Sequence, residues 1–166
     1  MSLRMHSKDG NHALIEKVVS TLRDRGETVS FAESCTGGLL SSLLTAHSGV
    51  SDVYMGSIVA YSNQVKENLL GVSQTQLRSV GAVSLPVARA MAVGVRERMG
   101  TTWALSITGI AGPGGGTVTK PVGTVCIGVA GPAIDKADQV HFAGSRSVIQ
   151  LASAEQALRL LLNEMV

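Results

Sequence analysis

The spacing of apolar and polar residues changes along the chain between two periods, one typical of helices and one typical of strands. Apolar residues at helical spacing predict helices over residues 11–25, 39–46, 63–70, 85–98 and 147–165. Short β-branched and apolar runs predict strands over residues 28–32, 53–61, 103–107, 122–129 and 139–142. Because helices and strands alternate, the pattern indicates an α/β fold: a single-domain α/β/α sandwich with a mixed, mostly parallel central sheet.

The domain organisation follows from length and continuity. The chain has 166 residues, which fit one domain of ordinary size, and no linker or internal repeat divides it. We therefore expect an N-terminal tail over residues 1–10 and one domain over residues 11–166. A domain of this length can bury a core and shape a pocket.

Composition narrows the classes of function. Aromatic residues make up 3% and the net charge is +2, so neither base stacking nor charge supports nucleic-acid binding. No apolar stretch reaches the ~18 residues that a membrane span needs. The N-terminus lacks the apolar region of a signal peptide, so a cytoplasmic location is expected. Two cysteines, Cys35 and Cys126, are too few for a disulfide scaffold.

Ser34 lies where a predicted strand gives way to a predicted helix, and Gly37 and Gly38 follow it. This arrangement can expose a hydroxyl at a strand end and direct the N–H groups of the helix N-terminus at its target. Such groups bind an oxyanion or a phosphate. The same glycines also occur in plain tight turns, and the stretch is neither a G-x-S-x-G elbow nor a Walker loop. The spacing leaves both roles open.

The two neighbours of Ser34 offer further chemistry. Cys35 is an alternative nucleophile if the helix N-terminus lowers the pKa of its thiol, and otherwise an inert buried thiol. Glu33 either orients a group in the site or caps the helix N-terminus electrostatically.

A second polar cluster ends the strand predicted over residues 53–61. Tyr61, Ser62 and Asn63 are consecutive, and Lys66 follows Ser62 by about one helical turn. Strand ends are where open α/β sheets place ligand groups. A partly desolvated lysine has a lowered pKa and can act as a general base toward serine, while Tyr61 could relay the proton or protonate the leaving group. A solvated lysine and an edge-strand tyrosine are the structural alternative.

A glycine-rich loop over residues 109–121 follows the third predicted strand and includes Gly109 and Gly112. It has no Walker sequence, and a strand rather than a helix is predicted after it, so it does not fit a dinucleotide-binding motif. Its amides can approach a ligand closely. Unstructured loops of this length are uncommon in compact domains unless they are functional.

The histidines give no metal site. They are scattered, and none has metal-ligand spacing to a cysteine or to another histidine: His6, His12, His47 and His141. We expect no metal and no other cofactor. The sequence leaves a Ser-His-Asp triad open, although no histidine lies in a motif-like setting.

Several stretches together resemble the CinA C-terminal domain family, the nicotinamide-nucleotide amidases (PncC-like), which also includes the competence/damage-inducible proteins CinA. The resemblance covers roughly residues 11–165. It rests on residues 32–39 (AESCTGGL), 56–63 with Lys66, 70–72, 81–84, 87–91, 108–115 and 120–125.

The resemblance implies an activity and a site. The activity is hydrolysis of the carboxamide of nicotinamide mononucleotide to nicotinate mononucleotide and ammonia, by a serine and without a metal. It implies Ser34 as the nucleophile, with Lys66 and Tyr61 as proton-handling partners. The residues implied to bind substrate are Glu33, Thr36, Gly37, Gly38, Asn63, Thr108, Gly109, Gly112 and Arg146.

One motif departs from the family. Relatives often have Gly-Asp-Arg where this chain has Gly144, Ser145 and Arg146. Arg146 matches the arginine of the family motif and suits a phosphate. Because Ser145 replaces the acid, the motif does not define which hydrogen bonds form around Arg146.

Many relatives carry a second, N-terminal domain, so the resemblance suggests the stand-alone amidase form here. The expected partners are the small-molecule substrate and other copies of the chain in a homo-oligomer, with neither nucleic acid nor a membrane. The alternative function is a non-catalytic competence/damage-inducible module that binds a nucleotide or a protein partner.

Overall fold

The computed structural model describes residues 8–166, so most of the expected tail over residues 1–10, including His6, lies outside the described residues. The helices are α1 (Lys8–Arg25), α2 (Leu39–Thr45), α3 (Asn63–Leu70), α4 (Gln74–Val80), α5 (Leu85–Met99) and α6 (Arg146–Met165). The strands are β1 (Val29–Glu33), β2 (Tyr54–Val59), β3 (Trp103–Gly109), β4 (Thr124–Ala130) and β5 (Asp135–His141).

The five strands form one sheet in the order β2-β1-β3-β4-β5. β1 pairs in parallel with both β2 and β3, while β4 runs antiparallel to β3 and to β5. Four strands therefore point the same way and β4 opposes them. The prediction of a mixed, mostly parallel sheet is confirmed.

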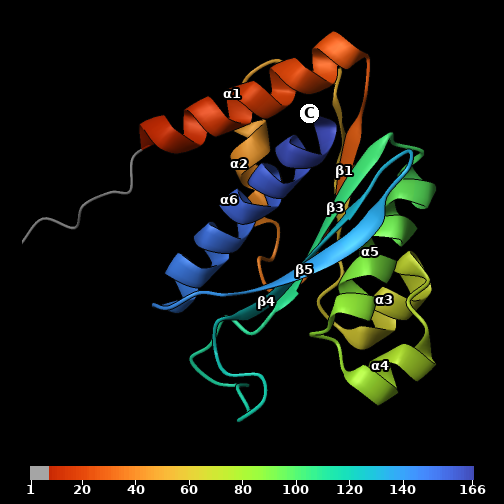
Figure 1. The fold of residues 1–166 in the computed structure, drawn as a ribbon, viewed down its shortest axis with the longest axis vertical. Helices are drawn as coiled ribbons and strands as arrows, with labels where there is room; N and C mark the ends of the chain where they lie inside the picture. The colour runs from red at the N-terminus through yellow and green to blue at the C-terminus, as the bar shows by residue number, and fades with distance from the viewer. Residues whose placement is uncertain (1–7) are drawn as a thin grey trace, which may run out of the picture.

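Helices cover both faces of the sheet (Figure 1). α1, α2 and α6 lie on one side, where they enclose the larger apolar core with residues such as Val18, Phe31 and Leu161. α3, α4 and α5 lie on the other, around a smaller core that includes Met91 and Val95. The predicted α/β/α sandwich is confirmed.

Two elements differ from the prediction. α4 was absent from it, because among its seven residues only Leu77 is buried and no helical apolar stripe can form. β5 begins at Asp135 and not at residue 139, since its first half is polar and lies at the exposed edge of the sheet. Its strand character comes from pairing with β4, which a local pattern does not report.

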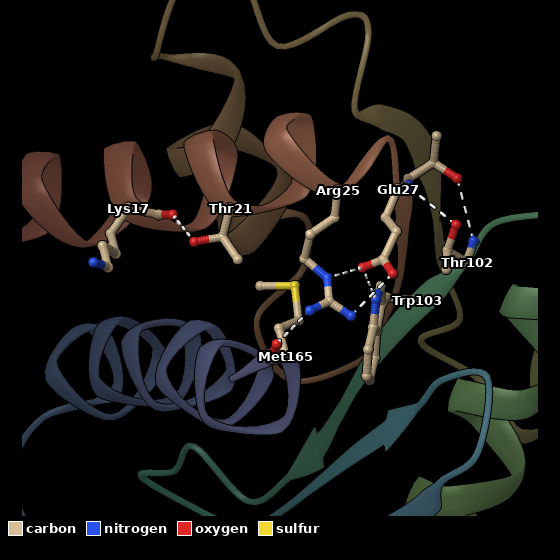
Figure 2. Close-up of polar contacts among 8 residues, drawn as sticks. Lys17, Thr21, Arg25, Glu27, Thr102, Trp103 and Met165 are labelled. Atoms are coloured by element: carbon tan, nitrogen blue, oxygen red, sulfur yellow. Dashed lines mark hydrogen bonds and ion pairs between the residues drawn. The ribbon is translucent and has the colours of Figure 1, made fainter.

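A polar cluster joins four elements at the opposite end of the sheet from the carboxyl ends of β1 and β3 (Figure 2). Trp103 Nε1 donates to Glu27 Oε2 at 2.7 Å, and Arg25 Nε donates to the same oxygen at 2.8 Å. The Arg25 guanidinium lowers the pKa of Glu27, and its Nη1 also donates to the main-chain oxygen of Met165 at 2.8 Å. This cluster fixes the starts of β1 and β3 against the ends of α1 and α6.

Within residues 8–166, no helix combines the length and the apolar character that crossing a membrane requires.

Candidate active site

The candidate site lies at the edge of the sheet where β1, β2 and β3 end. Ser34 directly follows β1, Tyr61 follows β2 by two residues, and Thr108 and Gly109 close β3. Because parallel strands share their carboxyl edge, these three strand ends meet there. The start of β4 and the loop over residues 110–123 complete the same edge.

The turn after β1 depends on its glycines. Gly37 has a φ of 59° and Gly38 a φ of 101°, values in the left-handed region that glycine adopts without strain. The turn is fixed by hydrogen bonds on both sides of Ser34: its N–H donates to Ile107 O at 2.9 Å, and Gly37 N–H donates to Ser34 O at 3.0 Å. The hydroxyl is thus held at a rigid strand-to-helix junction.

α3 delivers a lysine to this serine. The helix starts at Asn63 because Ser62 Oγ caps it, accepting from Val65 N–H at 3.2 Å. Lys66, near the middle of the helix, is only 1% exposed, and its Nζ lies 3.0 Å from Ser34 Oγ. The two residues form a buried pair within hydrogen-bond reach.

In the described chain, Lys66 Nζ has three hydrogen-bond partners: Ser34 Oγ and two main-chain oxygens. Nζ donates to Ala60 O at 2.8 Å and to Tyr61 O at 3.3 Å. Burial lowers the pKa of Lys66, and no carboxylate is among its hydrogen-bond partners in the described chain. A lysine in this setting can lose its proton and serve as a base.

Tyr61 contacts Lys66 through its main chain and not through its side chain. Its carbonyl contacts Nζ, whereas its side chain is 64% exposed and its hydroxyl accepts from Arg146 Nη2 at 3.1 Å. Arg146, the first residue of α6, also donates through Nη1 to Gly112 O at 2.8 Å. Arg146 therefore links the segment after β2 to the glycine-rich loop.

These residues enclose a pocket of about 280 Å³. The side chains of Ser34 and Lys66 lie at it, and it is completed by the following residues: Cys35, Tyr61, Asn63, Ala82, Val83, Thr108, Gly109, Ile110, Ala111, Gly112, Gly114, Gly115 and Arg146. A larger groove of about 650 Å³ runs along α5 and β5, away from Ser34, and no buried titratable side chain lines it among the described residues.

The structure brings together eight of the twelve site residues that the resemblance implied: Ser34, Tyr61, Asn63, Lys66, Thr108, Gly109, Gly112 and Arg146. It does not place Glu33, Thr36, Gly37 or Gly38 on the pocket. Ala82 and Val83, from the connection between α4 and α5, were not among the site residues predicted. The only sequence signal for them was the stretch 81–84 in the family resemblance.

The N-terminal amides of α2 bond to Glu33 inside the protein, so the anion-binding role that the sequence left open for them is not the one observed. Gly38 and Leu40 N–H donate to Glu33 Oε2, each at 3.0 Å, and Ser41 N–H donates to Glu33 Oε1 at 2.9 Å. The carboxylate of Glu33 thus accepts the N–H groups at the start of α2 that could otherwise bind an anion. The capping role, one of the two open interpretations of Glu33, is the one observed.

Cys35 lines the pocket but is not poised as a nucleophile. Burial raises the pKa of its thiol to about 12, so that the thiol stays protonated at neutral pH. The lowered pKa that would make Cys35 an alternative to Ser34 is therefore not found.

No histidine lines this pocket. Across residues 8–166, no group of three or more His, Cys, Asp and Glu side chains is arranged to hold a metal ion.

The sequence matches the family described as "CinA C-terminal domain" over residues 11–165. A CinA-like protein of Trichormus variabilis is 54% identical over 155 residues, which cover 91% of this chain and 37% of that protein. A CinA-like protein of Prochlorococcus marinus is 47% identical, with 92% of this chain and 37% of that protein covered. The chain thus spans about 37% of the length of these curated relatives.

Solved structures agree over almost the whole chain. The competence/damage inducible protein CihA from Agrobacterium tumefaciens has a TM-score of 0.91 at 37% identity, with 98% of this chain and 99% of that chain covered. A competence-damaged protein (CinA) superfamily protein from Escherichia coli has a TM-score of 0.91 at 32% identity, with 98% and 94% covered. On sequence and fold together, this chain belongs to the CinA C-terminal domain family.

Proposed function

We propose that this domain is a serine amidohydrolase that converts nicotinamide mononucleotide to nicotinate mononucleotide and ammonia. The observation that supports this most directly is the 3.0 Å contact between Ser34 Oγ and the Nζ of Lys66, a lysine that is 1% exposed. A serine needs a base to become nucleophilic, and a desolvated lysine is one of the side chains that can supply it.

The two carbonyls beside Lys66 support the role of base by orienting the amine. A neutral lysine amine has two N–H groups and one lone pair. With Ala60 O and Tyr61 O taking the two N–H groups, the lone pair is left for the hydroxyl proton of Ser34. The same contacts keep Nζ fixed when it becomes charged, because all three hydrogens of the ammonium then have partners.

Acylation follows from this geometry. Ser34 Oγ attacks the carboxamide carbon, and its proton passes to Lys66 Nζ. The carbon–nitrogen bond then breaks, Lys66 returns the proton to the departing nitrogen, and ammonia leaves. An acyl ester on Ser34 remains.

Deacylation uses the same base. A water molecule attacks the ester carbon while Lys66 takes one of its protons. The carbon–oxygen bond to Ser34 breaks and Lys66 returns the proton to Oγ, which restores both residues. The second proton of the water stays on the new carboxylic acid, which releases it to solvent and leaves as the carboxylate.

The lining of the pocket also suits an anionic substituent. Arg146 is an exposed cation at the pocket, and the glycine-rich loop next to it presents main-chain groups at Gly112, Gly114 and Gly115. An arginine with nearby amides is a common phosphate-binding arrangement. We therefore assign the phosphate of the substrate to Arg146 and the carboxamide to Ser34. In the described chain no hydrogen bond joins the Tyr61 hydroxyl to Ser34 or Lys66, so a proton-handling role requires that the hydroxyl come within reach of the reacting groups when substrate binds.

Ammonia release from nicotinamide mononucleotide tests the proposal. Purified protein is expected to release ammonia, and Ser34→Ala to release none, provided circular dichroism shows that the variant is folded. Nicotinamide and its riboside, which lack the phosphate, are expected to be poor substrates.

The alternative, a non-catalytic nucleotide-binding module, predicts a different result. The mononucleotide would then raise the melting temperature of the protein without any turnover. If the protein hydrolyses another primary amide but not nicotinamide mononucleotide, the proposed roles of Ser34 and Lys66 stand and only the proposed substrate is overturned.

A further inference from the structure

Glu33 directly precedes Ser34, yet its carboxylate points away from the pocket. It is fully buried, and its two oxygens accept five hydrogen bonds. Three go to Oε2, from Thr36 Oγ1 and from Gly38 and Leu40 N–H. The other two go to Oε1, from the N–H and the hydroxyl of Ser41.

The hydrogen bond from Thr36 closes the turn that carries Ser34. Thr36 Oγ1 donates to Glu33 Oε2 at 2.7 Å, so the residues on either side of Ser34 and Cys35 are joined by a short charge-assisted contact. Thr36 is itself buried. The path of the backbone at Ser34 is thereby defined from Glu33 to Thr36.

The hydrogen bonds to α2 have an electrostatic consequence. A helix N-terminus attracts anions, and that of α2 lies within a few residues of Ser34. Glu33 satisfies the amides of Gly38, Leu40 and Ser41, so a substrate phosphate cannot use them. Among the described residues, the cationic side chains that line the pocket are Lys66 and Arg146.

We infer that Glu33 is a positioning residue for Ser34: it fixes the turn that holds the serine against Lys66. This inference rests on the proposed function for its choice of substrate. Glu33 touches no reacting atom, and its effect reaches the chemistry only through Ser34.

Four variants separate this role from a merely structural one. Glu33→Ala removes the acceptor of all five hydrogen bonds, including the one that closes the turn. Thr36→Val removes the turn-closing hydroxyl at nearly constant volume. Thr36→Ser keeps that hydroxyl and is the conservative rescue. Ser41→Ala removes a hydrogen bond to the same carboxylate on the side away from the turn, and is the matched control.

Two readouts are needed, one of which does not depend on the substrate. The first is kcat and KM for nicotinamide mononucleotide. The second is the rate at which a small fluorophosphonate labels Ser34, followed by intact mass with Ser34→Ala as the blank. Melting temperatures are measured for every variant, and if Glu33→Ala does not fold, Thr36→Val carries the test.

Glu33→Ala and Thr36→Val are expected to lower both kcat and the labelling rate roughly 10- to 100-fold, as a displaced reacting group does. KM should change little. Thr36→Ser should keep most of the wild-type labelling rate. Ser41→Ala should also keep most of that rate, even if its melting temperature is as low as that of Thr36→Val.

Two results would overturn the inference. One is an unchanged labelling rate in Thr36→Val, and the other is a loss in Ser41→Ala that matches its loss of stability. If wild-type protein is labelled at Ser34 but does not hydrolyse the nucleotide, the proposed substrate fails while the labelling series still decides the role of Glu33. Wild-type protein that is not labelled at all counts against both.

Discussion

Lys66 Nζ lies 3.0 Å from Ser34 Oγ, although the two residues are 32 positions apart in the chain. The contact exists because β1 and β2 are parallel neighbours, so the turn after one and the helix after the other meet at the same sheet edge. The lysine is buried there and donates hydrogen bonds to two main-chain carbonyls. Its protonation state depends on that burial.

The pH dependence of turnover should report the deprotonation of Lys66. Burial lowers the pKa of Lys66, and only the neutral amine can accept the proton of Ser34. We expect kcat/KM to rise with pH to a plateau, with an apparent pKa below the ordinary lysine value of about 10.4. Steady-state kinetics across the pH range of the folded protein measure it. A rate that stays constant over that whole range would show that another group is the base.

The stability of the protein should also depend on this lysine. Because its pKa is lowered in the folded state, the unfolded chain holds a proton that the folded chain has released, and stability rises with pH up to the unfolded pKa. Lys66→Met removes this contribution. We expect the variant to gain stability relative to wild type at the lower pH, and the difference to shrink toward pH ~10. Urea unfolding at several pH values measures the free energy of unfolding of both proteins. A difference between them that stays constant with pH would contradict the prediction.

Replacement of Arg146 should affect binding more than chemistry. Arg146→Gln removes the cation that we assign to the phosphate, and a charge-assisted hydrogen bond contributes about 1.5–3 kcal/mol. KM for nicotinamide mononucleotide should therefore rise roughly 10- to 150-fold with little change in kcat. Arg89→Gln, which breaks a surface ion pair with Asp135 away from the pocket, is the control. Equal losses in the two variants would argue against a phosphate contact.

The thiol of Cys35 should resist alkylation in the folded protein. Burial raises its pKa to about 12, and the thiol rather than the thiolate is present at pH 8. Iodoacetamide at that pH is expected to leave Cys35 unmodified unless the chain is first unfolded, as peptide mass mapping can show. Rapid alkylation of folded protein would restore Cys35 as a candidate nucleophile.

A glycine far from the pocket sets the packing of α3 on α5. A Cβ at Gly94 would lie 1.9 Å from Leu70 O, a main-chain atom that cannot move independently of its helix. Gly94→Ala is expected to destabilise the fold by about 1–3 kcal/mol or more. Gly114→Ala, where a Cβ meets nothing within 4 Å, is the matched control for thermal unfolding. Equal melting temperatures for the two variants would contradict the packing argument.

Much of the fold could be predicted from local pattern. The strands β1, β3 and β4 are buried and β-branched or apolar, and the longest helices carry apolar residues at regular spacing, so their periods identify them. α4 and the first half of β5 could not be identified in this way. Both are polar and exposed, and they are held by neighbours that no local window includes.

The site divides in the same way. The chain order alone determined that Ser34 ends a strand before two glycines, that Lys66 lies one turn into a helix, and that a glycine-rich loop follows another strand. These are local features, set by residue type and spacing. Only the parallel pairing of β1 with β2 and β3 decided that they share one pocket.

The same tertiary contacts decided what each side chain does. Burial lowers the pKa of Lys66, burial keeps the Cys35 thiol protonated, and the amides of α2 turn Glu33 away from the pocket. Sequence fixes which groups are available. Their protonation and direction depend on desolvation and on partners distant in the chain, and these exist only once the sheet and its two helical layers have assembled.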